Sequence, residues 1–165
     1  MKKVDIREMT AKDWNGVARV YQQGIDSNAC TFVTVCPTYE AWDASHIDSC
    51  RFVAEIEGEI AGFVCLSPTS VRASFSGVVE VSIYIDQAFQ NMGIGTLLMQ
   101  NLIKASEEQG FWTIYSSIFI DNHGSRKLHE KSGFRQIGVR EKIAKDSLGN
   151  WRDTVIYERR SEVVI

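Results

Sequence analysis

The stretch VVEVSIYI at residues 78–85, followed by QNMGIG at residues 90–95, decides the fold. Its first part predicts a β-strand, because aliphatic and polar residues alternate with the period of two that a strand requires. One face is aliphatic and the other carries Glu80, Ser82 and Tyr84. A central strand covered by helices is usually apolar on both faces. The polar row therefore indicates either a carboxylate that does chemistry or one that pairs with a cation or faces solvent, and the strand alone leaves both open.

A loop with two glycines leads from this strand into a helix predicted over residues 93–109, whose apolar residues recur at helical spacing. Gly93 and Gly95 let the backbone approach a ligand closely, and the first amides of the helix point its positive dipole end at that ligand. The loop therefore predicts a pyrophosphate cradle, although a plain connecting loop explains it too. It is neither a dinucleotide fingerprint nor a P-loop, because no third glycine and no Gly-Lys-Ser/Thr follows.

A third polar segment spans Asn122 to Phe134. Asn122 or Ser125 can cap a short helix there, and His129 shares a helical face with Ser125, four residues before it. A single histidine on a helix is more often structural than catalytic. His129 is a candidate catalytic residue only because the other two segments accompany it.

Outward from these segments, strands and helices alternate. Strands are predicted over residues 4–7, 51–56, 60–66, 78–85, 113–119, 135–143 and 154–159, and helices over 14–25, 38–49, 93–109 and 125–132. Thr10 with Asp13 resembles a capping box, and Thr38 is a plausible helix cap. This order predicts an α/β (α+β mixed) fold, with helices on both faces of one mixed sheet.

Composition limits the function classes. The 165 residues are expected to form a single domain, 1–165, with 44% hydrophobic and 24% charged residues. A net charge of −3 argues against nucleic acid as a partner. Charged residues near the N-terminus do not resemble a signal peptide, and no apolar run reaches membrane-spanning length. We therefore expect a cytoplasmic protein that does not bind membranes.

The cysteines do not indicate a metal site. The four of them, Cys30, Cys36, Cys50 and Cys65, form no C-x-x-C pair, and only His46 lies near them in the sequence. We expect reduced thiols and no bound metal.

Taken in order, these motifs resemble one family. The glycine loop after the polar strand, followed by Asn122-x-x-Ser125-x-x-Leu128-His129-x-x-x-Gly133-Phe134, resembles the GNAT superfamily of N-acetyltransferases. Further landmarks resemble its phosphinothricin and methionine sulfoximine acetyltransferases, namely Thr31-Phe32, Pro37-Thr38, Arg72, Glu80-x-Ser82-x-Tyr84, Leu128-His129 and Trp151-x-Asp153. The resemblance covers nearly the whole chain.

The resemblance implies a twisted mixed sheet of about seven strands flanked by about four helices, with strands four and five splayed around acetyl-CoA. It implies that the coenzyme-binding residues are Ile83, Tyr84, Ile85, Gln90, Asn91, Met92, Gly93, Ile94, Gly95, Thr96, Asn122 and Ser125. The first three would pair with the pantetheine arm through backbone groups. Residues 90–96 would hold the pyrophosphate.

The resemblance also implies the catalytic groups Glu80 and His129 and an acceptor pocket lined by Phe32, Arg72 and Tyr84. Glu80 would accept a proton from the amine directly or through one water. His129 would protonate the leaving thiolate or assist as a second base. Phe75 stands in the same pocket where a tyrosine is expected, and the missing hydroxyl weakens the case for phosphinothricin as the acceptor.

The resemblance implies acetyl transfer from acetyl-CoA to the amine of a small, amino-acid-like acceptor of the phosphinothricin, methionine sulfoximine or methionine sulfone type. The alternatives are a peptide N-terminus, a polyamine or an aminoglycoside as the acceptor, or a non-catalytic acyl-CoA-binding module. A homodimer is expected from the resemblance alone.

Overall fold

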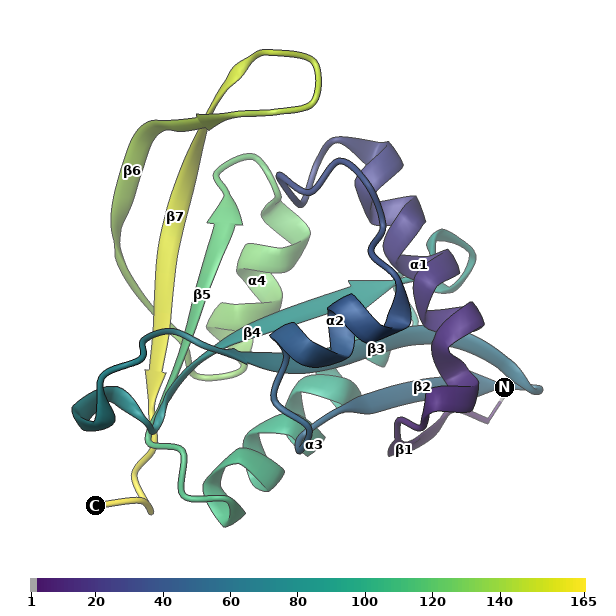
Figure 1. The fold of residues 1–165 in the computed structure, drawn as a ribbon, viewed down its shortest axis with the longest axis horizontal. Coiled ribbons are helices and arrows are strands. Elements are labelled where there is room, and N and C mark those ends of the chain that lie inside the picture. The colour runs from purple at the N-terminus through teal and green to yellow at the C-terminus, as the bar shows by residue number, and fades with distance from the viewer. Residues whose placement is uncertain (1–2) are drawn as a thin grey trace.

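The computed structural model describes residues 3–165, which form a seven-stranded mixed sheet in the order β1-β2-β3-β4-β5-β7-β6 (Figure 1). The strands are β1 Asp5–Glu8, β2 Phe52–Ile56, β3 Glu59–Pro68, β4 Val78–Ile85, β5 Thr113–Phe119, β6 Arg135–Lys145 and β7 Trp151–Arg160. The helices are α1 Trp14–Ser27, α2 Tyr39–Ser45, α3 Ile94–Glu108 and α4 His123–Lys131. The expected α/β (α+β mixed) class, element order, seven strands and four helices are confirmed.

Alternation along the central strands separates two apolar cores, one on each face of the sheet. The core under α1 and α2 includes Val17, Val20, Trp42, Val53, Phe63 and Cys65. The core under α3 and α4 includes Val64, Leu66, Val79, Val81, Leu98, Leu102 and Tyr157. Neighbouring residues of one strand, such as Cys65 and Leu66, thus serve opposite faces, as a helix-covered sheet requires.

The strands β4 and β5 are parallel but pair over only three positions. The pairs are Val78 with Thr113, Val79 with Ile114 and Glu80 with Tyr115. Beyond them β4 stays paired with β3, and β5 stays paired with β7. The two strands diverge from this point, which Figure 1 shows as an open V between their arrowheads. The expected splay is confirmed.

The boundaries of several elements differ from the predicted ones. Thr38 caps α2 as predicted, but the helix ends at Ser45 instead of residue 49. His46 is extended, and the amide of Ile47 donates to the carbonyl of Leu66 at 2.9 Å, so the sheet holds this segment. Asn122 caps α4 by accepting from the amide of Ser125 at 3.2 Å, which starts this helix before the predicted residue 125.

The last two strands are also longer than predicted. β6 reaches Lys145, and β7 begins at Trp151. The register of this pair shifts between Gln136 and Gly138 and again between Arg140 and Ala144. These irregularities hide the strand period in the sequence, because the extra residues on β6 interrupt the regular alternation of faces.

Gly77 lies where β4 and β5 begin to pair. Its carbonyl accepts from the amides of Trp112 and Thr113, at 2.9 and 3.1 Å. A Cβ at this position would lie 2.0 Å from the indole of Trp112. The start of the parallel pair therefore requires glycine.

We expect Gly77→Ala to lower the free energy of unfolding by about 1–3 kcal/mol, because the indole must shift within packed structure. Urea denaturation followed by circular dichroism measures this change. Gly124→Ala is the control, because a Cβ there has no atom within 4 Å and the position is helical. Equal midpoints for the two variants would contradict the close approach.

Candidate active site

A cavity of about 920 Å³ opens where β4 and β5 diverge. This volume is at the upper end of the roughly 300–1,000 Å³ that small-molecule sites occupy. Its wall comes from α1, the loop at residues 29–33, β4, the loop before α3 and the start of that helix, β5, α4, β6 and β7. The cavity therefore contacts both helical layers through the gap in the sheet.

Glu80 and His129 reach this cavity from opposite faces of the sheet. Glu80 is paired with Tyr115, so its side chain shares the face of α1 and α2. His129 lies on α4, on the other face, where its ring packs against Phe134 and Tyr157 at centroid distances of 4.9 and 6.2 Å. Both residues line the cavity because Glu80 is the last paired residue before the strands separate.

The carboxyl of Glu80 is half-buried. Burial raises its pKa, and the positive charge of Arg140 opposes part of that rise. A carboxylate with a raised pKa accepts a proton more readily near neutral pH than an ordinary glutamate does. Glu80 thus has the properties of a general base.

His129 is 1% exposed and its ring orientation is set by one contact. Its Nδ1 lies 2.7 Å from the backbone carbonyl oxygen of Ser125. A carbonyl only accepts, so Nδ1 carries the proton and Nε2 presents a lone pair. Nε2 is buried without a hydrogen-bond partner in the described part of the chain.

Burial also lowers the pKa of His129, although the hydrogen bond to Ser125 opposes that effect. The ring is therefore neutral at pH 7. Of the two roles expected from the sequence, this state suits an acceptor or second base. To act as a proton donor, the ring of His129 would first have to bind a proton at Nε2.

The turn before the glycine loop is fastened to α1. Asp86 is 2% exposed, and its carboxylate accepts from the amide of Ala88 at 2.8 Å, from Gln23 at 3.2 Å and from the guanidinium of Arg19. The amide of Gln87 donates to Gln23 at 3.0 Å. These bonds fix where the following loop begins.

The loop itself exposes the N-terminus of α3. Asn91 and Gly93 adopt left-handed conformations, with φ of 62° and 77°, and Gly93 is the cap residue of the helix. Glycine has no side chain to occupy the first amides, which are therefore open to an anion. Of the residues expected to hold the coenzyme, only Met92 and Thr96 lie outside the cavity wall, and Met92 is 43% exposed.

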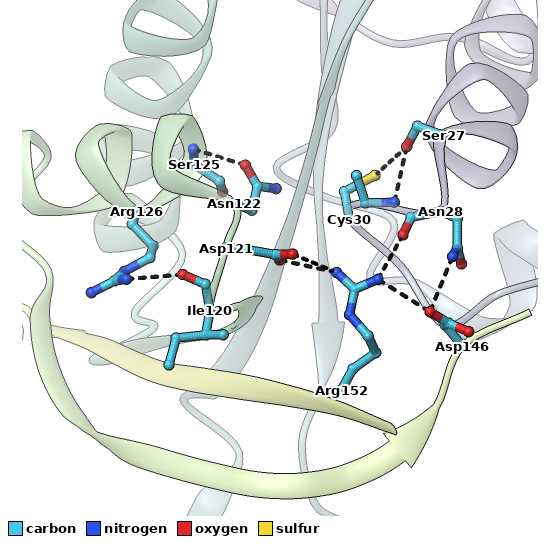
Figure 2. Close-up of polar contacts among 11 residues, drawn as sticks. Ser27, Asn28, Cys30, Ile120, Asp121, Asn122, Ser125, Arg126, Asp146 and Arg152 are labelled. Atoms are coloured by element: carbon cyan, nitrogen blue, oxygen red, sulfur yellow. Dashed lines mark hydrogen bonds and ion pairs between the residues drawn. The ribbon is translucent and has the colours of Figure 1, made fainter. Parts of the chain in front are cut away.

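At the base of α4, Figure 2 shows the side chain of Asn122 directed at the amide of Ser125. Both residues line the cavity, as do Ile83, Tyr84 and Ile85 of β4. The structure thus gathers the expected coenzyme-binding residues of three separate elements around one cleft.

The expected acceptor residues divide into two groups. Phe32 and Tyr84 line the cavity, and the ring of Phe32 lies 4.7 Å from that of Phe119. Arg72 and Phe75 do not line it. They belong to the exposed segment around the 3-10 turn Ala73–Phe75, and Phe75 is 45% exposed.

Two polar residues on the last two strands are among the cavity residues that were not predicted. Arg140 on β6 lines the cavity, and its guanidinium makes no hydrogen bond or ion pair with another residue of the described chain. Thr154 on β7 is 2% exposed, and its hydroxyl has no partner within residues 3–165. Both reach the site through the pairing of Arg140 with Thr154 and of Thr154 with Phe119. No local motif indicates this placement.

Residues 3–165 contain no cluster of three histidine, cysteine, aspartate or glutamate residues suited to holding a metal ion. None of their helices combines the length and apolar character needed to cross a membrane.

Comparison with known proteins agrees with this geometry. The model of the acetyltransferase (GNAT) family matches residues 14–134. Phosphinothricin N-acetyltransferase of Streptomyces viridochromogenes is 30% identical over 97% of this chain and 89% of its own. The L-methionine sulfoximine/L-methionine sulfone acetyltransferase of Pseudomonas paraeruginosa is 28% identical over 61% of this chain and 58% of its own.

The fold agrees as well. A phosphinothricin acetyltransferase of Sinorhizobium meliloti, solved in complex with acetyl-CoA, superposes with a TM-score of 0.86 at 24% identity, over 95% of this chain and 88% of that one. The family match covers most of the chain, and the splayed sheet follows the same fold. The chain therefore belongs to the acetyltransferase (GNAT) family, and the expected enzyme class of N-acetyltransferase is confirmed.

Proposed function

We propose that this protein transfers the acetyl group of acetyl-CoA to the amine of a small, amino-acid-like acceptor. One observation carries the proposal. The N-terminus of α3, whose first amides are open, and the carboxyl of Glu80, whose pKa is raised, line the same cleft. The relatives that act on phosphinothricin and methionine sulfoximine support the acceptor class. The related structure solved with acetyl-CoA supports the donor.

The coenzyme would lie along the free edge of β4. Backbone groups of residues 83–85 are not paired with β5 and are available to the pantetheine arm. The amides at residues 93–95 would bind the pyrophosphate. Asn122 and Ser125 would contact the arm from α4.

Glu80 would act on the amine. An α-amino group has a pKa of about 8 and is mostly protonated at pH 7, yet only the neutral amine attacks a thioester. Glu80 would take that proton directly or through one water. Backbone amides near Tyr84 would donate to the carbonyl oxygen as it gains charge. His129, on the other face, would accept a proton or hydrogen bond beside the sulfur.

The acceptor would lie between Glu80 and β6. Phe32 and Tyr84 would form its apolar walls. Arg140, whose guanidinium makes no hydrogen bond or ion pair within residues 3–165, would bind the acceptor's carboxylate with two parallel hydrogen bonds. This proposal assigns the acceptor's carboxylate to Arg140 and not to Arg72.

A homodimer and a cytoplasmic location remain predictions. Exposed apolar side chains on the edge strand β6 support the dimer, because Ile137, Val139 and Ile143 are 48%, 46% and 47% exposed. Such a row of side chains often marks an interface.

The test of the proposed function is a thiol-release screen with acetyl-CoA. The acceptors are methionine sulfoximine, methionine sulfone, phosphinothricin, the common amino acids, polyamines and short peptides. We expect turnover with free amino-acid-like amines. Turnover restricted to peptides or polyamines would overturn the acceptor class, and thermal stabilisation by acetyl-CoA without thiol release would indicate a binding module.

Glu80→Gln should lower kcat about 10²–10⁴-fold, because a positioned base contributes about that much. The rate of the wild-type enzyme should fall as the pH drops through the raised pKa of Glu80, and this acid limb should be absent from the variant. Steady-state rates across pH measure both effects. Glu108→Gln, at an exposed position on α3, is the control. Wild-type turnover of Glu80→Gln would remove this residue from the mechanism.

Arg140→Gln should raise the KM for a carboxylate-bearing acceptor roughly tenfold or more, because a charge-assisted pair is lost. The KM for the matching amine that lacks the carboxylate should not change. Arg72→Gln is the comparison variant and should have little effect. The reverse pattern would assign the carboxylate to Arg72.

Gly93→Val should raise the KM for acetyl-CoA several-fold and leave the acceptor KM unchanged. A left-handed conformation costs a non-glycine residue about 1–2 kcal/mol, so the loop would shift away from its present path. Gly58→Val controls for strain, because Gly58 has a similar φ of 83° in the β2–β3 turn, outside the cavity. Equal KM values in the two variants would contradict a pyrophosphate cradle.

A further inference from the structure

Three segments surround the acceptor end of the cavity. They are the loop at residues 29–33 after α1, the end of β5 at Phe119, and the β6–β7 hairpin. Each is a surface connection or a strand end, and such segments need a specific contact to hold them in one position. Arg152, the second residue of β7, contacts Phe119 at the end of β5, Asp146 in the hairpin, and Asn28, which directly precedes the loop at residues 29–33.

The guanidinium of Arg152 makes four hydrogen bonds, which Figure 2 shows. Nη1 donates to the carbonyl oxygen of Asn28 at 3.0 Å and to Asp146 at 3.2 Å. Nη2 donates to both carboxylate oxygens of Asp121, at 2.9 and 3.1 Å. We call Arg152, Asn28, Asp121 and Asp146 the Arg152 latch.

A second set of hydrogen bonds, made by the side chain of Asn28, joins the end of α1 directly to the β6–β7 hairpin. Asn28 ends α1 in a left-handed conformation, with φ of 52°. Its side-chain nitrogen Nδ2 donates to Asp146 at 3.0 Å, and its side-chain oxygen accepts from the hydroxyl of Ser147 at 3.0 Å. Residues of β7 and the hairpin thus hydrogen-bond to both the backbone and the side chain of Asn28.

Asp146 also shapes the tip of the hairpin. Its second oxygen accepts from the amides of Leu148 and Asn150, at 3.0 and 2.9 Å. Burial alone would raise the pKa of this carboxyl, but the surrounding donors outweigh burial and lower it to about 2. The latch therefore keeps its negative partner throughout the pH range in which the enzyme would be assayed.

Contacts with two aromatic side chains connect the latch to the cavity. The guanidinium of Arg152 lies over the ring of Phe119, 4.3 Å from its centroid, and Phe119 packs against Phe32 at 4.7 Å. Phe32 and Phe119 both line the cavity, whereas Arg152 does not. Displacement of the guanidinium would therefore reach the cavity wall at Phe119 directly and at Phe32 through Phe119.

We infer that Arg152 is a positioning residue for the acceptor, holding the loop at residues 29–33 against the β6–β7 hairpin so that Phe32 stays in the pocket wall. This inference rests on the proposed function of the cleft. An exposed ion pair would contribute little. The side chains of Arg152 and Asp146 are only 16% and 1% exposed, and the donors form a planar fork that lysine cannot reproduce.

The first test compares kinetics. Arg152→Gln should raise the acceptor KM roughly tenfold, because hydrogen bonds to two charged partners are lost, and should leave the KM for acetyl-CoA within about twofold. Arg152→Lys should restore only part of the loss. Asn28→Gly keeps the backbone conformation and the carbonyl, removes the side-chain bonds and should give an intermediate effect. Arg135→Gln is the control, because it removes an exposed cation that pairs with Glu158 across the same two strands.

The second test is independent of activity. Hydrogen exchange of the amides at residues 29–33 should accelerate in Arg152→Gln and Asn28→Gly but not in Arg135→Gln. Unchanged exchange in this loop, or equal rises of both KM values, would overturn the latch. A wild-type enzyme without turnover on any amine would overturn the proposed function instead, and the exchange result would still decide the latch. If Arg152→Gln fails to fold, the same two readings are made on Arg152→Lys and Asn28→Gly.

Discussion

The site depends on the point at which β4 and β5 stop pairing. Only three residue pairs join these parallel strands, and Glu80 belongs to the last of them. Past that pair, the inner edges of both strands carry backbone groups that have lost their usual partners. Such groups need water or a ligand. An interrupted ladder therefore leaves both space for an extended ligand and backbone groups that can hydrogen-bond to it, without any dedicated side chain.

The same interruption lets two titratable groups share a cleft while lying in different surroundings. Glu80 extends from the α1 side, and burial shifts its pKa upward. His129 is enclosed on the α4 side, and burial shifts its pKa downward. Burial thus stabilises the neutral form of each group. The sheet separates their environments, so each pKa can be set by its own neighbours.

Features with a local cause were predictable from the sequence, whereas those set by tertiary contacts were not. The period of β4, the glycines before α3 and the capping residues Thr38 and Asn122 all act within a few residues of chain. The early end of α2 depends on a bond to Leu66, and Arg140 reaches the cavity only through a shifted register across three strands. Arg72 shows the limit of a resemblance, because a matching position in the chain did not place it in the cavity wall.

The cavity wall is formed partly by core helices and strands and partly by surface connections. The proposed coenzyme end is formed by β4, α3 and α4, which also build the large core, so most substitutions there would cost stability. The proposed acceptor end is formed by a loop and a hairpin, next to which Arg152 makes its hydrogen bonds. Surface connections accept insertions and exchanges that cores do not. An evolving lineage could therefore change the amine it modifies by altering the outer segments alone, while inheriting the transfer chemistry intact.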